Sequence, residues 1–254
     1  MSDPGTGERG GSRMGDHVIE ARGVTRTFTM GDVSVRALRG VDLAVERGEF
    51  VAVAGPSGSG KTTLFNILGG LDDPTTGQVL VDGVNLAELD RKQKARLRLE
   101  KIGFVFQAYN LIPVLTAFEN VEYPLILRKV PEAERRRRVG EILEAVGLGG
   151  MMHRRPNRMS GGQQQRVAVA RALVGNPAVV LADEPTANLD SETGASLLRM
   201  MSDMNREKGL TFLFSTHDPM VMAAARRLVR LKDGVVVSDA GQESDIPSGT
   251  QAGA

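Results

Sequence analysis

The stretch FVAVAGPSGSGKTT, residues 50–63, decides the fold of this chain. Its first five residues are apolar and predict a buried β-strand, and a helical pattern from Lys61 to Gly69 follows a glycine-rich turn. This arrangement fits the pattern G-x-x-x-x-G-K-[ST], in which the turn joins a strand to the start of a helix. Glycines let such a turn fold tightly, so that its N–H groups and the helix N-terminus face an anion. The sequence therefore predicts a phosphate-binding loop, the P-loop, at residues 55–63.

The residues of this loop have separate expected contacts. Backbone N–H groups of the turn are expected to surround the triphosphate of ATP, and Lys61 is expected to reach its β- and γ-phosphates. The Thr62 hydroxyl is expected to ligate Mg²⁺. The predicted nucleotide-binding residues of the loop are Gly55, Pro56, Ser57, Gly58, Ser59, Gly60, Lys61, Thr62 and Thr63.

The length and composition of the chain limit what else it contains. Its 254 residues fit one α/β domain, or a core domain with an insertion. The formal net charge of +1 gives no global field that favours nucleic acid or an anionic membrane. The absence of cysteine excludes disulfides and thiolate metal sites. We find neither a long apolar segment nor the apolar core of a signal peptide, so a role at a membrane would require a partner that spans it.

Short apolar runs alternate with helical patterns along the chain, which predicts an α/β fold with a parallel sheet. Strands are expected at 50–54, 102–106, 178–182 and 210–215, and further helices at 162–174, 191–208 and 219–227. The segment from about 107 to 158 has no strand pattern, so we expect a mainly helical subdomain inserted into the core. Residues 1–16 and 239–254 have no apolar periodicity, and we expect them to be disordered tails on a domain of residues 17–238.

A second motif, VVLADE, occupies residues 179–184. A buried strand of this kind delivers its last side chains to the edge of the sheet where ligands bind, beside the P-loop. Asp183 is expected to hold Mg²⁺ through water, and Glu184 is expected to polarise the attacking water as a general base. The alternative interpretation is an ordinary strand that ends in an acidic turn.

The third motif is MSGGQ, residues 159–163. Its serine and glycines open a helix and combine an N-cap with free backbone N–H groups, which is a second anion-binding arrangement. Because the P-loop already surrounds one triphosphate, a second phosphate site in the same chain is best explained if it serves a different nucleotide. The alternative interpretation is a helix start capped by a serine.

These three motifs, in this order, resemble those of the ABC ATPase family, whose signature reads Leu-Ser-Gly-Gly-Gln. Here Met159 replaces the leucine. The resemblance covers nearly all of residues 18–238 and implies a P-loop NTPase core. In that fold a RecA-like parallel sheet is accompanied by an antiparallel β part and an inserted helical subdomain. Four shorter matches are Phe28 as the adenine-stacking aromatic, Gln107 in VFQ as the Q-loop glutamine, Asp190 in ANLD as the D-loop aspartate, and His217 in STHD as the switch histidine.

The resemblance also implies a role for each of these residues. Gln107 would contact Mg²⁺ or the lytic water and sense a transmembrane partner, while His217 would contact the γ-phosphate. Asp190 would cross the interface to a second protomer. The signature residues expected to bind ATP held by that protomer are Ser160, Gly161, Gly162 and Gln163. Without the resemblance, Gln107 is a polar strand cap, His217 a loop histidine and Phe28 a core residue.

Within the family, the residues most similar to the lipoprotein-releasing and macrolide-exporter-like group are 69–79, 104–125, 176–190 and 215–218. This likeness implies a homodimer that drives separate membrane permease subunits from the cytoplasmic face of the inner membrane. Four apolar residues of the helical segment are expected to form a groove for a partner helix, with packing in the subdomain core as the alternative. They are Tyr109, Leu111, Leu115 and Phe118.

Two other functions within the family fit the sequence less well. A soluble ATPase of translation or DNA repair usually has two cassettes, or a long coiled coil between P-loop and signature, whereas this chain has one cassette and a compact intervening segment. A scaffold that binds ATP without hydrolysis is disfavoured because Glu184 and His217 are both present. The basic run Arg135–Arg138 lies among glutamates and predicts a solvated helix face, so we expect no nucleic-acid partner.

Overall fold

The structure is a computed structural model that describes residues 17–31 and 33–244. The expected tail at residues 1–16 and the last ten residues of the chain lie outside this range. The other tail was predicted to begin at Asp239, and this boundary is wrong. Asp239 lies within the last strand, β10 (Val235–Gly241), where its carboxylate pairs with Arg227 on the neighbouring strand.

A six-stranded sheet forms the centre of the fold, in the order β10-β9-β3-β8-β7-β6. Its other strands are β3 (Phe50–Ala54), β6 (Ile102–Val105), β7 (Val179–Asp183), β8 (Phe212–Thr216) and β9 (Arg227–Lys232). β3 runs parallel to β8 and β9, and β7 runs parallel to β6 and β8. The four predicted strands are therefore confirmed. The strands β3 and β8 are buried along their whole length, which explains their unbroken apolar sequences.

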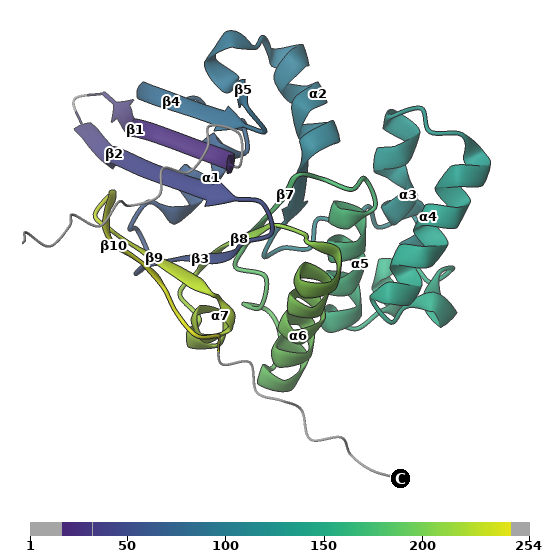
Figure 1. Ribbon diagram of the computed structural model, residues 1–254. Helices are drawn as coiled ribbons and strands as arrows, with labels where there is room; N and C mark the ends of the chain where they lie inside the picture. The colour runs from purple at the N-terminus through teal and green to yellow at the C-terminus, as the bar shows by residue number, and fades with distance from the viewer. Residues whose placement is uncertain (1–16, 32, 245–254) are drawn as a thin grey trace, which may run out of the picture.

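A second sheet is antiparallel, in the order β2-β1-β4-β5. Its strands are β1 (His17–Met30), β2 (Val33–Glu46), β4 (Thr76–Val81) and β5 (Val84–Asn85). It packs with helix α1 (Lys61–Leu68) and one face of the central sheet to form a hydrophobic core. Figure 1 shows it at the upper left, above the central strands. The resemblance implied an antiparallel part, but the residues alone located none of these strands.

Helices cover the other face of the central sheet. The remaining helices are α2 (Arg91–Lys101), α3 (Ala117–Leu127), α4 (Glu132–Ala145), α5 (Gly161–Leu173), α6 (Ser191–Lys208) and α7 (Pro219–Ala224), with short 3₁₀ turns at Leu86–Glu88, Gly149–Met151 and Pro156–Arg158. Figure 1 shows α3 and α4 at the right, beside α5. The last predicted helix was too long, because Arg227 begins β9 and its guanidinium pairs with Glu49 and Asp239.

The segment from 107 to 158 contains α3, α4 and two 3₁₀ turns, with no strand among its residues. Its first loop is held by Asn120, which is buried and joins the backbone of Ile112, Leu115 and Thr116 through hydrogen bonds. Arg136, Arg137 and Arg138 of α4 pair with glutamates on the same helix, whereas Arg135 pairs with Glu122 of α3. The bonds from Arg137 and Arg138 lower the pKa of Glu134 to about 2. This is the solvated, ion-paired face that the sequence predicted.

None of the helices in the described part of the chain combines the length and hydrophobicity that a membrane span requires.

Candidate active site

The P-loop joins β3 to α1, as the sequence predicted. Gly58 and Gly60 have φ of 80° and 104°, a left-handed region that favours glycine. A Cβ atom at Gly60 would lie 2.6 Å from the Ala37 carbonyl oxygen, and one at Gly55 would lie 2.1 Å from that of Leu231. The loop therefore passes so close to β2 and β9 that side chains at these glycines would not fit.

Lys61 is the first residue of α1, and its side chain turns back across the loop. Its ammonium group donates to the carbonyl oxygens of Gly55 at 2.7 Å and Pro56 at 3.1 Å. The residue is only 7% exposed, so its charge is held inside the curve of the P-loop. Positive charge and N–H groups thus converge on one small volume, which suits a polyphosphate.

Asp183 ends β7 and lies next to the P-loop. Burial raises the pKa of its carboxyl group, while the nearby Lys61 charge and Thr62 hydroxyl act in the opposite direction. Its Oδ1 atom is buried and has no hydrogen-bond partner among the described residues. A buried carboxylate oxygen without a donor, beside a hydroxyl, suits a hard cation such as Mg²⁺. The described residues hold no group of three His, Cys, Asp or Glu side chains that could bind a metal ion.

Glu184 follows Asp183 and has a left-handed φ of 48°. Its N–H donates to the Ser215 carbonyl of β8 at 2.9 Å, which fixes the peptide at the edge of the sheet. Its Oε1 lies 2.7 Å from the Nδ1 atom of His217, the first residue after β8. The carboxylate is 14% exposed and the imidazole 68% exposed. The structure therefore brings together the predicted general base and the predicted switch histidine, with the histidine on the solvent side.

The signature residues open α5. The Ser160 hydroxyl accepts from the Gln163 N–H at 3.3 Å, and the Ser160 N–H donates to the Gln163 side chain at 3.1 Å, which is a capping box. A Cβ atom at Gly162 would lie 2.3 Å from a methyl group of Thr193 in α6, so a side chain there would require Thr193 to move. Within the described chain no hydrogen bond joins these residues to the P-loop. The start of α5 and the P-loop are thus two helix starts that are not joined by a hydrogen bond in the described chain.

The backbone of the predicted Q-loop glutamine contacts the D-loop, and the predicted D-loop aspartate caps a helix. The Gln107 carbonyl accepts from the side chain of Asn188 at 2.9 Å, a residue that the sequence analysis did not single out. Asp190 caps α6 by accepting from the N–H of Thr193 at 2.9 Å and from its hydroxyl at 2.7 Å. These bonds lower the pKa of Asp190. The D-loop carboxylate is thus held at the start of α6, close to the signature.

Phe28 lies on β1, opposite Val35 of β2, and its ring is 39% exposed. The guanidinium of Arg26 lies 4.6 Å from the ring centroid, an arrangement that favours a cation–π interaction. The β2 segment that follows Val35 contacts the P-loop at Gly60. The ring is therefore exposed near the loop, and stacking on adenine remains a prediction.

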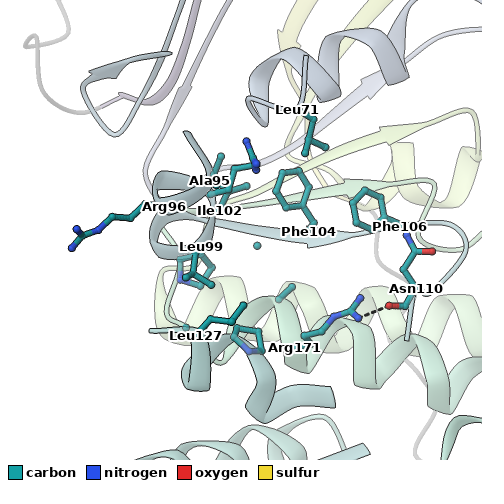
Figure 2. A pocket seen from close by; sticks show the side chains of 16 residues that line it. Leu71, Ala95, Arg96, Leu99, Ile102, Phe104, Phe106, Asn110, Leu127 and Arg171 are labelled. Atoms are coloured by element: carbon teal, nitrogen blue, oxygen red, sulfur yellow. Dashed lines mark hydrogen bonds between the residues drawn. The ribbon is translucent and has the colours of Figure 1, made fainter. Parts of the chain in front are cut away.

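The four residues predicted to form a groove, Tyr109, Leu111, Leu115 and Phe118, are all partly buried. Leu111 and Phe118 pack against the hydrophobic core, and the Tyr109 hydroxyl lies against the signature at Gly161. A different apolar groove, with a volume of about 670 Å³, lies between α2, β6, α3 and α5 (Figure 2). Its lining includes Leu71, Leu99, Phe104, Phe106, Leu127 and Arg171.

Known proteins match the chain over most of its length. The family model for ABC transporters matches residues 38–187. A macrolide export ATP-binding/permease protein MacB of Syntrophobacter fumaroxidans is 47% identical over 92% of this chain and 33% of its own length. An uncharacterised ABC transporter ATP-binding protein of Thermotoga maritima is 50% identical over 85% of this chain and 92% of its own length. The chain thus spans about a third of the MacB relative and most of the Thermotoga protein.

Solved structures also include a cassette that is similar to this chain. The ATP-binding cassette MJ0796, whose sequence is from Methanocaldococcus jannaschii, was solved as a dimer in a post-hydrolysis state bound to ADP and Pi. It aligns with a TM-score of 0.81 and 45% identity over 88% of this chain and 98% of that chain. With the P-loop, the signature and the acidic strand end in family order, this chain belongs to the ABC transporter family, as a cassette that binds and hydrolyses ATP.

Proposed function

We propose that two copies of this chain close around two ATP molecules and drive a separate membrane permease from the cytoplasmic face of the inner membrane. The observation that carries the proposal is the presence of two anion-binding helix starts, α1 behind the P-loop and α5 behind the signature, with no hydrogen bond joining them within the described chain. When one ATP molecule occupies the P-loop, the signature of the same chain can bind a second ATP molecule. A two-fold dimer gives both motifs a ligand.

Within each site, different residues of one chain bind the nucleotide, hold the metal ion and activate water. The P-loop and Lys61 bind and orient the phosphates, and the Phe28 ring stacks on the adenine. Thr62 and Asp183 would hold Mg²⁺, which neutralises charge on the β- and γ-phosphate oxygens when bound. Glu184 accepts a proton from the attacking water, and His217, hydrogen-bonded to Glu184, orients that carboxylate and contacts the γ-phosphate. Gln107, two residues after β6, would contact Mg²⁺ or the lytic water, as the family resemblance implies.

The second chain closes each site. The Gly161 and Gly162 N–H groups and the Ser160 hydroxyl of its signature bind the γ-phosphate, while the Ser160 and Gln163 N–H groups form the capping box. The Asp190 carboxylate of this second chain lies at the interface. Support comes from the similar cassette MJ0796, which was solved as a dimer with ADP and Pi. ATP then stabilises the closed dimer, and hydrolysis removes the phosphate that both chains share.

A crosslink between two chains tests this arrangement. The chain has no native cysteine, so Ser57→Cys and Glu192→Cys introduce two unique thiols. Both residues are exposed, on the P-loop and beside the signature respectively. Ser59 and Gly162 are less suitable, because Ser59 is buried and a side chain at Gly162 would clash with Thr193. In chains that also carry Glu184→Gln, a short thiol-reactive crosslinker is expected to join Ser57→Cys of one protomer to Glu192→Cys of another when ATP is added.

Mixtures of singly labelled chains provide the control for this experiment. A band of two chains should require both cysteines and ATP, and it should be absent with ADP. The sandwich is wrong if the thiols join only within one chain, or if the ATP-bound Glu184→Gln protein stays monomeric at high concentration.

The apolar groove is the surface that best fits a helix of the permease. Leu71 and Leu127 in its lining are about half exposed. Tyr123 and Ile126 on the same helix as Leu127 are also exposed, so the apolar surface continues along α3. An apolar groove beside an exposed helix face suits a partner helix with an apolar side. The MacB relative supports a permease partner, because its name describes an ATP-binding and permease protein in one chain.

Replacing Leu127 by Asp should separate partner binding from hydrolysis. The side chain is 51% exposed, so the change should leave folding intact and basal ATP turnover within about twofold of wild type. A charge in the groove should abolish copurification of the permease from detergent-solubilised membranes of the native host. The matched control is Val237→Asp, since Val237 is 57% exposed on β10, away from α3 (Figure 1). Equal permease recovery with both variants would argue against the groove.

The cargo of the transporter is proposed from likeness alone. MacB-type relatives favour macrolide-type efflux, and the related lipoprotein-releasing group is the other candidate. Deleting the gene and measuring both macrolide susceptibility and lipoprotein localisation in the host distinguishes the two. A chain that copurifies with no membrane protein would instead support a soluble ATPase or an ATP-gated scaffold.

A further inference from the structure

Gln165 of α5 is a completely buried amide whose hydrogen-bonding capacity is only partly used. Its Nε2 donates to the carbonyl oxygen of Pro185 at 2.7 Å, and its exposed fraction is zero. Its Oε1 is also buried and has no hydrogen-bond partner among the described residues. An unpaired buried oxygen lowers stability, and an apolar side chain of the same size would avoid that cost. The donor to Pro185 is therefore the feature that distinguishes glutamine from an apolar residue here.

Pro185 directly follows the predicted general base, and the peptide around it is fixed on three sides. The Glu184 N–H donates to Ser215 of β8, and the Thr186 hydroxyl donates to Asp218 at 2.7 Å. Gln165 supplies the third connection, from α5. Glu184 itself has a left-handed backbone, which a non-glycine residue keeps only when its surroundings hold it. The position of the Glu184 carboxylate thus depends on these bonds.

The third connection differs from the other two because α5 begins with the signature. Gln165 lies about one helical turn after Gly161, on the same rigid element. We propose that Gln165 is a positioning residue that fixes Glu184 relative to the signature helix of its own chain. Given the proposed dimer, the signature contacts the partner's ATP while Glu184 acts on the ATP in its own P-loop. A shift of α5 on closing around one nucleotide would therefore move the base of the other site, and Gln165 would couple the two sites.

Replacing Gln165 by Met tests the positioning role. Methionine has a similar length and suits a buried site, but it cannot donate to Pro185. We expect turnover at saturating ATP to fall by roughly 10- to 100-fold, the scale of a misplaced catalytic group, with KM for ATP changed less than about threefold. The matched control is Gln164→Met on the same helix, because Gln164 donates to Met159 and not to the Glu184 loop. This control should stay within about threefold of wild-type turnover.

Combining the change with Glu184→Gln shows whether Gln165 acts through the base. If it does, Gln165→Met should cause no further loss of the residual turnover of the Glu184→Gln protein, and the ATP-dependent dimer should form as before. A further loss, or a weakened dimer, would mean that Gln165 supports the signature instead, and the proposal would be overturned. Wild-type turnover of Gln165→Met would overturn it as well.

If Gln165→Met does not fold, Gln165→Asn carries the same expectation, since its amide is one methylene too short to reach Pro185. If the Glu184→Gln protein does not dimerise with ATP, the proposed dimer is wrong. The turnover of Gln165→Met still tests whether Gln165 positions Glu184 in that case.

Discussion

Replacing Glu184 by Gln is expected to slow ATP hydrolysis by about 10²- to 10⁴-fold, the usual contribution of general-base catalysis. The Glu184 carboxylate follows β7 and lies 2.7 Å from Nδ1 of His217. Its side chain is 14% exposed, so it is positioned to take a proton from water. Glutamine keeps the size and the hydrogen bonds but cannot accept that proton. ATP binding should be unchanged, because Lys61 and the P-loop remain intact. Phosphate release and equilibrium binding of ATP are the two measurements.

The control for this variant is Glu134→Gln, which neutralises an acidic residue of α4 that pairs only with arginines of its own helix among the described residues. It should hydrolyse ATP at the wild-type rate. The Glu184→Gln protein should also accumulate as a dimer with ATP on size-exclusion chromatography. Near-normal turnover of Glu184→Gln would show that another group activates the water.

The arrangement of the catalytic side chains was predictable because it follows from the topology of a parallel sheet. The carboxyl ends of parallel strands meet at one edge, so motifs that directly follow β3, β7 and β8 must lie together. That reasoning placed the Asp183 carboxylate beside the P-loop, whereas the role of His217 was implied by the family resemblance. It required only the strand positions, which long apolar runs reveal.

The antiparallel sheet and α2 were harder to predict because their residues lack a regular pattern. The pairing of β1 with β2 contains several register shifts, which break the alternation of apolar and polar residues. Helix α2 buries only Leu97, and charged residues make up most of its length, so it has no apolar stripe. Both elements are fixed by contacts with the rest of the chain rather than by local sequence.

The groove and the buried hydrogen bonds were missed for a different reason. Apolar residues at 111 and 118 looked available for a partner, but sequence cannot distinguish an exposed apolar side chain from one packed on a core several elements away. The residues that do line the groove come from α2, β6, α3 and α5, which are far apart in the chain. Gln165 and Asn188 donate to backbone carbonyls of distant loops. Because every residue has a backbone carbonyl, the sequence does not indicate which one accepts such a bond.

Replacing Lys61 by Ala should remove most of the affinity for ATP as well as the activity. The ammonium group is buried at the start of α1 and donates to the carbonyls of Gly55 and Pro56, so it is already held where the phosphates are expected. A hydrogen bond between charged groups contributes about 1.5–3 kcal/mol, which corresponds to roughly 10- to 150-fold in Kd. Turnover should fall further, because the same charge would stabilise the transferred phosphoryl group.

A comparison with Lys61→Met separates the charge from the packing of the side chain. Methionine retains an apolar stem of similar length, so any effect due to filling the loop should disappear while the loss of ATP affinity remains. Both variants should keep the wild-type circular dichroism spectrum, since the loop is also held by the backbone hydrogen bond from Gly234 to Ser59. Titration with a fluorescent ATP analogue gives Kd directly. Unchanged affinity in Lys61→Ala would mean that the backbone N–H groups of the P-loop bind the phosphates without help from this charge, and the role assigned to Lys61 would be wrong.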